Sequence, residues 1–225
     1  MSLALTRLLQ LASPALPVGA YTYSQGLEWA VESGTVKDEA SALAWIAGQL
    51  EWNPGRYEAP LLLRLMEAWT VGAHATAIEL DAEYLATRET AELRAETLQM
   101  GYSMKRLLHE VGDFPPPLLD AIAVSPAPTF PYVWTCAAAA WQIPAPDALT
   151  AWLWGWAENQ TMAALKAVPL GQAAGQRLLQ EIGRRLPAVV ERALTLDEAD
   201  YSNFAPGFAI ACCNHETQYT RLFRS

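Results

Sequence analysis

The sequence predicts an all-α protein: a single compact domain over residues 1–225, with about nine or ten helices and a C-terminal arm. Ala, Leu, Glu and Gln recur at helical spacing along the chain. Alternating runs of Val, Ile and Thr between hairpin turns, which strands would require, are nearly absent. Pro and Gly separate the periodic segments, and no linker or internal repeat marks a second domain.

The first helices are predicted from their end signals. Thr22 and Gln25 have the spacing of a capping box, which predicts a helix that Gly34 ends as a left-handed C-cap. A second helix is expected from about Asp38. The turn sequence "NPG" at 53–55 is expected to end it, because Pro and Gly interrupt helices.

The later helices follow the same punctuation. Pro60 suits the first turn of a third helix. The most regular helix is expected at 88–111, with Glu92 and Glu96 on its solvent side. Further helices are expected at 118–124, 131–142, 147–168, 171–186 and 188–194. The acidic, turn-like stretch that ends near residue 207 then detaches a last helix and a flexible C-terminal segment of about 207–225.

Composition excludes several classes of function. The chain has 24 acidic and 15 basic residues and a net charge of −9, which argues against nucleic acid as a partner. Apolar residues make up 52% of the chain and include nine Trp, so we expect apolar surface that meets a partner and forms a homodimer. No uninterrupted apolar run reaches the roughly 18 residues of a membrane span.

The cysteine count and the N-terminus indicate a cytoplasmic protein. Three cysteines, two of them adjacent, make no disulfide framework, which fits a reducing compartment. The first residues contain no long apolar stretch and no small-residue cleavage motif, so they do not resemble a signal peptide.

Catalytic motifs are missing from the sequence. It contains no G-x-x-x-x-G-K-[ST] phosphate loop, no G-x-G dinucleotide fingerprint and no G-x-S-x-G nucleophile elbow. His215 and Glu216 begin like the zinc motif H-E-x-x-H, but Tyr219 stands where the second histidine belongs. We therefore expect no enzymatic activity and no cofactor.

The end of the chain, "CCNHETQYTRLFRS", suggests a weak metal site. Cys212 and His215 share a helical face at i and i+3, and with Cys213 they offer thiolate and imidazole ligands that suit Ni or Zn. Two ligands do not complete a structural site. The alternative is that both cysteines are small buried apolar residues, which the sequence favours.

The same segment has the composition of a protein-binding arm. Tyr219, Leu222 and Phe223 are spaced for one apolar helical face, while Arg221 and Arg224 project elsewhere. A terminal segment of this kind frays unless it docks. Aromatic residues and Arg dominate binding hot spots, so a partner-binding arm is preferred over packing on its own domain.

Four stretches together resemble a known family. They are "LLQLASPALPVGAYTYSQGLEWAVESG", "RETAELRAETLQMG", "LKAVPLGQAAGQ" and "HETQYTRLFRS". In this order, and over nearly the whole chain, they are similar to the urease accessory protein F family. Asn214 departs from the pattern, because family members commonly carry a basic residue before His-Glu.

The resemblance implies an all-helical, non-enzymatic assembly factor for the nickel enzyme urease. Members of the family dimerise, bind the accessory protein called D or H, and recruit the GTPase accessory protein G. GTP-dependent nickel delivery to apo-urease is thereby coupled to the complex. The acidic composition, the many aromatic residues and the absence of a nucleotide motif agree with this role.

The family motifs carry over to particular residues. In the tail they imply contacts with the D or H protein at His215, Glu216, Tyr219, Arg221, Leu222, Phe223 and Arg224. In the N-terminal motif they imply partner contact, or shaping of the helix entrance, at Tyr21, Ser24, Gly26, Leu27 and Glu28. Lys166 lies in the "K-x-x-P-x-G-Q" region; it regulates the GTPase or, alternatively, is a snorkelling side chain.

Two other functions stay open from the residues alone. One is a nickel-binding metallochaperone that uses Cys212, Cys213 and His215. The other is a helical enzyme with an unrecognised pocket, which the lack of any catalytic constellation disfavours.

Overall fold

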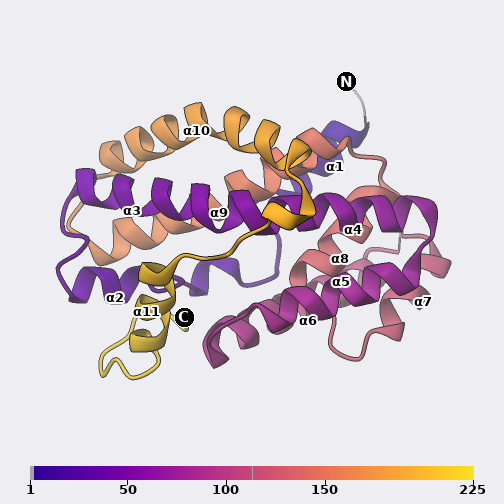
Figure 1. Cartoon of the computed structure of the whole chain (residues 1–225), viewed down its shortest axis with the longest axis horizontal. Coiled ribbons are helices and arrows are strands. Elements are labelled where there is room, and N and C mark those ends of the chain that lie inside the picture. Colours follow the sequence, from indigo (N-terminus) through magenta and orange to yellow (C-terminus); the bar gives the residue numbers. More distant parts are fainter. Residues whose placement is uncertain (1–2, 113) are drawn as a thin grey trace.

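The computed structural model describes residues 3–112 and 114–225, and over these ranges it is all-α without a strand, as predicted (Figure 1). The helices are α1 (Leu3–Leu11), α2 (Leu27–Glu32), α3 (Glu39–Trp52), α4 (Ala59–Val71), α5 (His74–Ala86), α6 (Ala91–Glu110), α7 (Pro116–Val124), α8 (Phe130–Ala140), α9 (Ala145–Ala167), α10 (Gln172–Thr195) and α11 (Pro206–His215). Short turns of 3-10 helix lie at Ala20–Thr22 and Glu198–Asp200, and a π-helical turn at Pro54–Glu58.

The core forms around α8 and α9. Helix α8 packs against both α4 and α6, and its side chains are buried without interruption over 131–138. Helix α9 contacts α10, α2, α3 and α4. Trp134 and Tyr132, two of the largest fully buried side chains, lie in α8. A helix that is apolar on every side has to be enclosed, which is why the amphipathic helices surround it.

Two glycines allow helices to approach closely. A Cβ added at Gly101 in α6 would lie 2.1 Å from the carbonyl oxygen of Pro128, just before α8. A Cβ at Gly175 in α10 would lie 2.6 Å from Leu165 Cδ1 in α9. A Cβ at Gly171 would meet no described atom within 4 Å, so the close contact of α9 and α10 depends on Gly175.

Several helix boundaries differ from the prediction at the N-terminal end. The capping box at Thr22 and Gln25 is wrong: α2 begins at Leu27, after Gly26 in the left-handed conformation (φ 76°). The Thr22 hydroxyl instead donates to the carbonyl oxygen of Gly19, at 2.8 Å. Helices α1 and α5 were not predicted, because α1 is short and α5 has only a weak apolar stripe.

Proline ends one predicted helix but does not end another. The turn at 53–55 ends α3 as predicted, because α3 stops at Trp52 and a π-helical turn at Pro54–Glu58 then leads into α4. Pro187 lies inside α10, which is one helix rather than two. The buried residues Leu186 and Val189 flank this proline, and packing of the continuous apolar face offsets the missing hydrogen bond. In the part of the chain that is described, no helix is long and apolar enough to cross a membrane.

Candidate partner-binding site

The C-terminal segment folds back onto the N-terminal motif. Helix α11 packs against α2, and residues 216–225 then run as irregular chain to end beside Ser24, with the C-terminus near α11 and α2 (Figure 1). The expected apolar helical face at Tyr219, Leu222 and Phe223 is wrong, since the described chain has no helix beyond His215. That this segment is flexible stays a prediction.

Helix α11 approaches α2 at a glycine. A Cβ on Gly26 would lie 3.0 Å from both the backbone nitrogen and Sγ of Cys212, and 3.1 Å from Cβ of Ala211. Cys212 is buried, and this burial raises the pKa of its thiol. Cys213, the next residue, is exposed. Gly26 therefore supplies both the left-handed turn and the space into which α11 packs.

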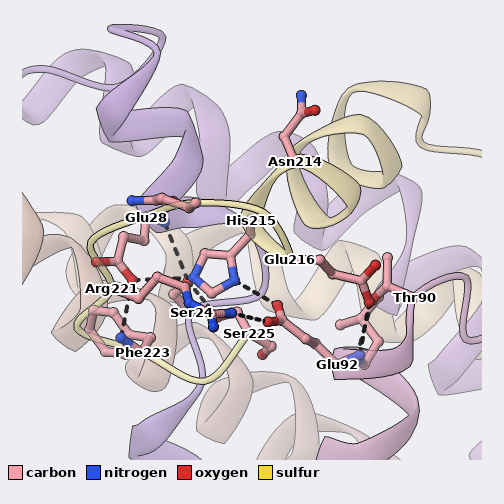
Figure 2. Close-up of polar contacts among 12 residues, drawn as sticks. Ser24, Glu28, Thr90, Glu92, Asn214, His215, Glu216, Arg221, Phe223 and Ser225 are labelled. Carbon is pink, nitrogen blue, oxygen red and sulfur yellow. Dashed lines mark hydrogen bonds and ion pairs between the residues drawn. The ribbon is translucent and has the colours of Figure 1, made fainter.

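His215 lies at the centre of the site (Figure 2). Its side chain is fully buried, with Nδ1 2.6 Å from Oε2 of Glu92 and Nε2 3.2 Å from Oε2 of Glu28. The two carboxylates come from different helices, since Glu28 belongs to α2 and Glu92 to the first turn of α6. The imidazole thus joins α11 to both of them.

Glu28 and Glu92 also hold the chain beyond α11. The backbone N–H groups of Leu222 and Phe223 donate to Glu28, at 2.7 and 3.1 Å. Arg221 forms an ion pair with the second oxygen of Glu92. Two carboxylates therefore accept bonds from the imidazole, a guanidinium and two backbone amides. The charge of Arg221 partly compensates for burying both carboxylates, which would otherwise be costly.

Glu216 caps α6. Its Oε1 accepts hydrogen bonds from the backbone N–H groups of Ala91 at 2.7 Å and Glu92 at 3.3 Å, while the Thr90 side chain accepts from Leu93. The first N–H groups of a helix have no partner within the helix, and its dipole favours negative charge there. The tail thus completes the N-terminus of α6 (Figure 2).

The last residue is bound on both sides. The backbone oxygen of Ser225 accepts from the backbone N–H and the hydroxyl of Ser24, both at 2.6 Å, and from the Gln25 backbone N–H at 3.0 Å. The Ser225 hydroxyl donates to Glu96 at 2.8 Å, and Gln25 Nε2 donates to the other Glu96 oxygen at 2.6 Å. Burial raises the pKa of Glu96 to about 7, although these hydrogen bonds lower it.

Phe223 and Lys166 meet at the same site. Phe223 is buried, and Nζ of Lys166 lies 5.4 Å from the centre of its ring. Lys166 is exposed near the end of α9. An ammonium group at this distance over an aromatic face is attracted to the ring electrostatically. The cation therefore does more than extend to solvent, because it contacts the tail.

The tail has an inward and an outward set of side chains. His215, Phe223 and Ser225 are buried against the protein's own domain. Tyr219 is fully exposed and the Leu222 side chain is 69% exposed, although the Leu222 backbone is bound to Glu28. The tail therefore presents two large side chains to solvent from a backbone that is anchored.

Some of the residues predicted from the N-terminal motif contact the C-terminal segment, and others have contacts elsewhere in the protein. Ser24, Gly26 and Glu28 contact the C-terminal segment directly, as described above. Leu27 is fully buried in the core. The Tyr21 hydroxyl donates to Glu158 in α9 at 3.2 Å, and burial beside that carboxylate raises the Tyr21 pKa to about 12. The structure thus brings the two motifs into one site.

Sequence reasoning missed Glu92 and Glu96 as members of this site. Both were expected to face solvent, but Glu96 is 7% exposed and the Glu92 side chain 17% exposed. The one feature of the sequence that could have identified them as site residues is their position in "RETAELRAETLQMG", one of the four stretches that carry the resemblance. The amphipathic pattern of α6 did not reveal that the tail covers its polar face.

The geometry gives the metal hypothesis no support. Among the described residues, no group of three or more His, Cys, Asp or Glu side chains is placed to hold a metal ion. Cys212 is buried against Gly26, Cys213 is exposed, and both nitrogens of His215 face carboxylates. These three side chains therefore do not form one ligand set.

Comparison with known proteins identifies the family. The family model UreF matches residues 36–183. The urease accessory protein UreF of Azoarcus sp. (strain BH72) is 61% identical over 99% of this chain and 96% of its own, and that of Dechloromonas aromatica (strain RCB) is 60% identical over 99% and 98%. The bifunctional urease accessory protein UreEF of Bordetella bronchiseptica is 48% identical over 98% of this chain and 52% of its own length. The chain belongs to the UreF family of urease accessory proteins.

Proposed function

We propose that this chain is a scaffold in urease maturation that binds the D or H accessory protein and recruits the GTPase accessory protein G. In this role it regulates GTP hydrolysis and couples it to nickel insertion into apo-urease. The observation that carries the proposal is the two-sided tail. Its backbone and inward side chains are anchored on α2 and α6, whereas Tyr219 and Leu222 face outward.

This anchoring favours partner binding through pre-organisation. A disordered segment loses conformational entropy when it binds, and a segment already held in place loses less. Five members of the predicted contact set are exposed, and two of them, Glu216 and Arg221, bind α6. We therefore assign the direct contact with the D or H protein to the other three, Tyr219, Leu222 and Arg224. His215, Glu216, Arg221 and Phe223 support that contact from within, by holding the tail.

Lys166 is proposed to act on the bound GTPase. It is exposed, and it touches the ring of Phe223 at the edge of the tail. A cation at this boundary responds to whether the tail is in place, which supports a regulatory role. Substituting Lys166 is expected to alter GTP turnover in the complex with little effect on folding.

We further propose that the protein forms a homodimer and acts in the cytoplasm. Exposed large apolar side chains lie on several elements, with Val71 and Phe204 both 77% exposed. The three cysteines are free, which suits a reducing compartment. The UreEF relative joins a UreF-like part to a second accessory function, and we infer that this chain works beside a protein of that kind.

The test replaces only outward side chains. Tyr219→Ala combined with Leu222→Ala should abolish capture of the purified D or H protein, because each hot-spot residue contributes about 2 kcal/mol or more. Tyr102→Ala is the matched control, since Tyr102 is also exposed but lies in the middle of α6. Circular dichroism should show unchanged helicity in both variants. Undiminished binding by the double variant would refute the assignment of the contact.

Deleting residues 215–225 is a less specific experiment. The deletion should still abolish partner binding and GTPase recruitment, with the helical body folded. However, it also removes the imidazole and the backbone amides that satisfy Glu28. The point variants keep those contacts and therefore separate binding from tail anchoring.

A further inference from the structure

A cavity lies between the segment that follows α1 and helices α6 and α9. It contains about 900 Å³ of space, open mouth included, and apolar side chains such as Leu16, Met100 and Phe130 form most of its wall. Phe130 stacks on Trp152 with ring centres 5.1 Å apart, so two packed aromatic rings form part of that wall. A concave, mostly apolar cavity with a few polar groups is the usual form of a small-molecule site.

A buried ion pair lies in the wall of this cavity. Nη1 of Arg88 donates to Oε1 of Glu58 at 2.9 Å, and the two side chains are only 5% and 7% exposed. Glu58 ends the π-helical turn Pro54–Glu58, a backbone form that recurs at functional sites. The guanidinium also lies over the ring of Tyr84, 4.3 Å from its centre. The ion pair is therefore enclosed and held in one orientation.

The ion pair leaves hydrogen-bonding groups without full partners. Nη1 of Arg88 binds Glu58 and Nη2 binds Thr87 at 3.2 Å, but the buried Nε has no partner among the described residues. Within the same ranges, Oε2 of Glu58 accepts from Trp152 Nε1 alone, at 3.4 Å, which is longer than a usual hydrogen bond. A buried donor without an acceptor is costly. A molecule that offers Nε an oxygen would therefore be stabilised in the cavity.

The charges of the cavity favour a neutral ligand. Arg88 is already paired with Glu58, and a second carboxyl group, that of Glu96, lines the same cavity. An anion would therefore meet two carboxyl groups beside one guanidinium. A cation would lie next to Arg88 and would give its Nε no acceptor. The polar group that fits is neutral and combines one acceptor with one donor.

We propose that this cavity binds a small neutral carboxamide that carries a flat apolar group. The carbonyl oxygen of the ligand accepts from Nε of Arg88, and its N–H group donates to Oε2 of Glu58. A carboxamide has its acceptor and its donor side by side in one plane, which suits a guanidinium paired with a carboxylate. The apolar group packs against Phe130 and Trp152. This binding does not depend on the role proposed above in urease maturation.

Benzamide is the probe, compared with three analogues that keep the phenyl ring. Titration calorimetry of the full chain should give a Kd of about 1 mM or lower for benzamide. Benzoate is an anion without the donor, benzamidine is a cation without the acceptor, and toluene lacks both groups. Each should bind at least about tenfold more weakly than benzamide. Failure to detect benzamide binding at about 10 mM would overturn the proposal, as would equally tight binding of any analogue.

Two glycine variants locate the bound probe. Gly155 in α9 lines the cavity, and a Cβ there would meet no described atom within 4 Å, so Gly155→Leu should fold and occupy part of the cavity. Benzamide should then bind at least about tenfold more weakly. Gly48→Leu is the matched control, because Gly48 lies inside α3, has equally open space around its Cβ, and is not part of this cavity. Undiminished binding by Gly155→Leu would place benzamide elsewhere and refute the site.

Arg88→Lys tests the polar contact separately. The lysine keeps a positive charge opposite Glu58 but has no second N–H group in the position of Nε. The preference for benzamide over toluene should therefore disappear in this variant, while circular dichroism reports whether the helices remain intact. An unchanged preference in folded Arg88→Lys would contradict the assignment of the carbonyl oxygen to Arg88. If Arg88→Lys does not fold, the comparison of Gly155→Leu with Gly48→Leu still decides the proposal.

Discussion

The helices around α8 and the C-terminal segment are held in place by different forces. Helix α8 is enclosed by α4 and α6, and every side chain from 131 to 138 is buried. The C-terminal segment lies at the surface, where Glu28, Glu92 and Glu96 contact or accept hydrogen bonds from it and its own Glu216 accepts from the start of α6. One region is stabilised by removal of apolar surface from water, and the other by a network of charges and hydrogen bonds.

The two regions should therefore respond differently to changes in pH and salt concentration. Apolar burial depends little on pH or salt, whereas a network of carboxylates depends on both. An isolated hydrogen bond contributes about 1 kcal/mol, but a buried acceptor left without its donor costs more. The core is therefore expected to persist under conditions in which the C-terminal segment detaches.

The largest difference in the free energy of unfolding should come from replacing one leucine by alanine in each region. Leu62→Ala, in the fully buried face of α4, should lower the free energy of unfolding by about 2–5 kcal/mol. Leu222→Ala should change it by less than about 0.5 kcal/mol, because that side chain is 69% exposed. Urea titration followed by circular dichroism measures both. Similar losses for the two variants would mean that the tail belongs to the core.

Two glycine variants should test whether close packing at Gly26 holds α11 against α2. Gly26 and Gly34 both have φ of 76°, so an alanine at either position introduces backbone strain of about 1–2 kcal/mol. Only at Gly26 does the added methyl group also press on Cys212, since Gly34 has no described atom within 4 Å of that position. Gly26→Ala should therefore increase the rate at which a thiol reagent modifies Cys212, and Gly34→Ala should not.

Cys213 serves as the internal reference for that measurement. It is exposed and should react at the same rate in all forms of the protein. The ratio of the two rates, obtained by mass spectrometry of the labelled peptides, reports opening of α11. If both glycine variants increase the Cys212 rate equally, backbone strain alone explains the effect and close packing at Gly26 does not.

The smallest effect is expected where the tail caps α6. Glu216→Gln keeps an oxygen that can accept from Ala91 and Glu92 but removes the charge, so it should cost about 0.3–1 kcal/mol at low salt. The loss should diminish as the salt concentration rises, because Glu216 is exposed. Thermal unfolding at two ionic strengths measures it. A loss that is independent of salt would contradict a role for the helix dipole.

Local sequence patterns were sufficient for the helical class and for the regular helices. The expected start near Asp38 and the periodicity of 88–111 correspond to the observed starts of α3 and α6 and to most of their length. These features depend on neighbours within one or two turns, which the sequence displays directly. The four stretches that carry the resemblance also contain most of the site residues.

Tertiary structure alone decided how those residues are used. Glu28 and His215 are 187 residues apart in the chain, and no local pattern states that they meet. Glu92 and Glu96 look like solvent-facing residues on an amphipathic helix, yet the tail covers them. Pro187 looks like a helix end, yet packing on both sides keeps α10 continuous. Periodicity reports which side of a helix is polar, but burial depends on what the rest of the chain places against that side.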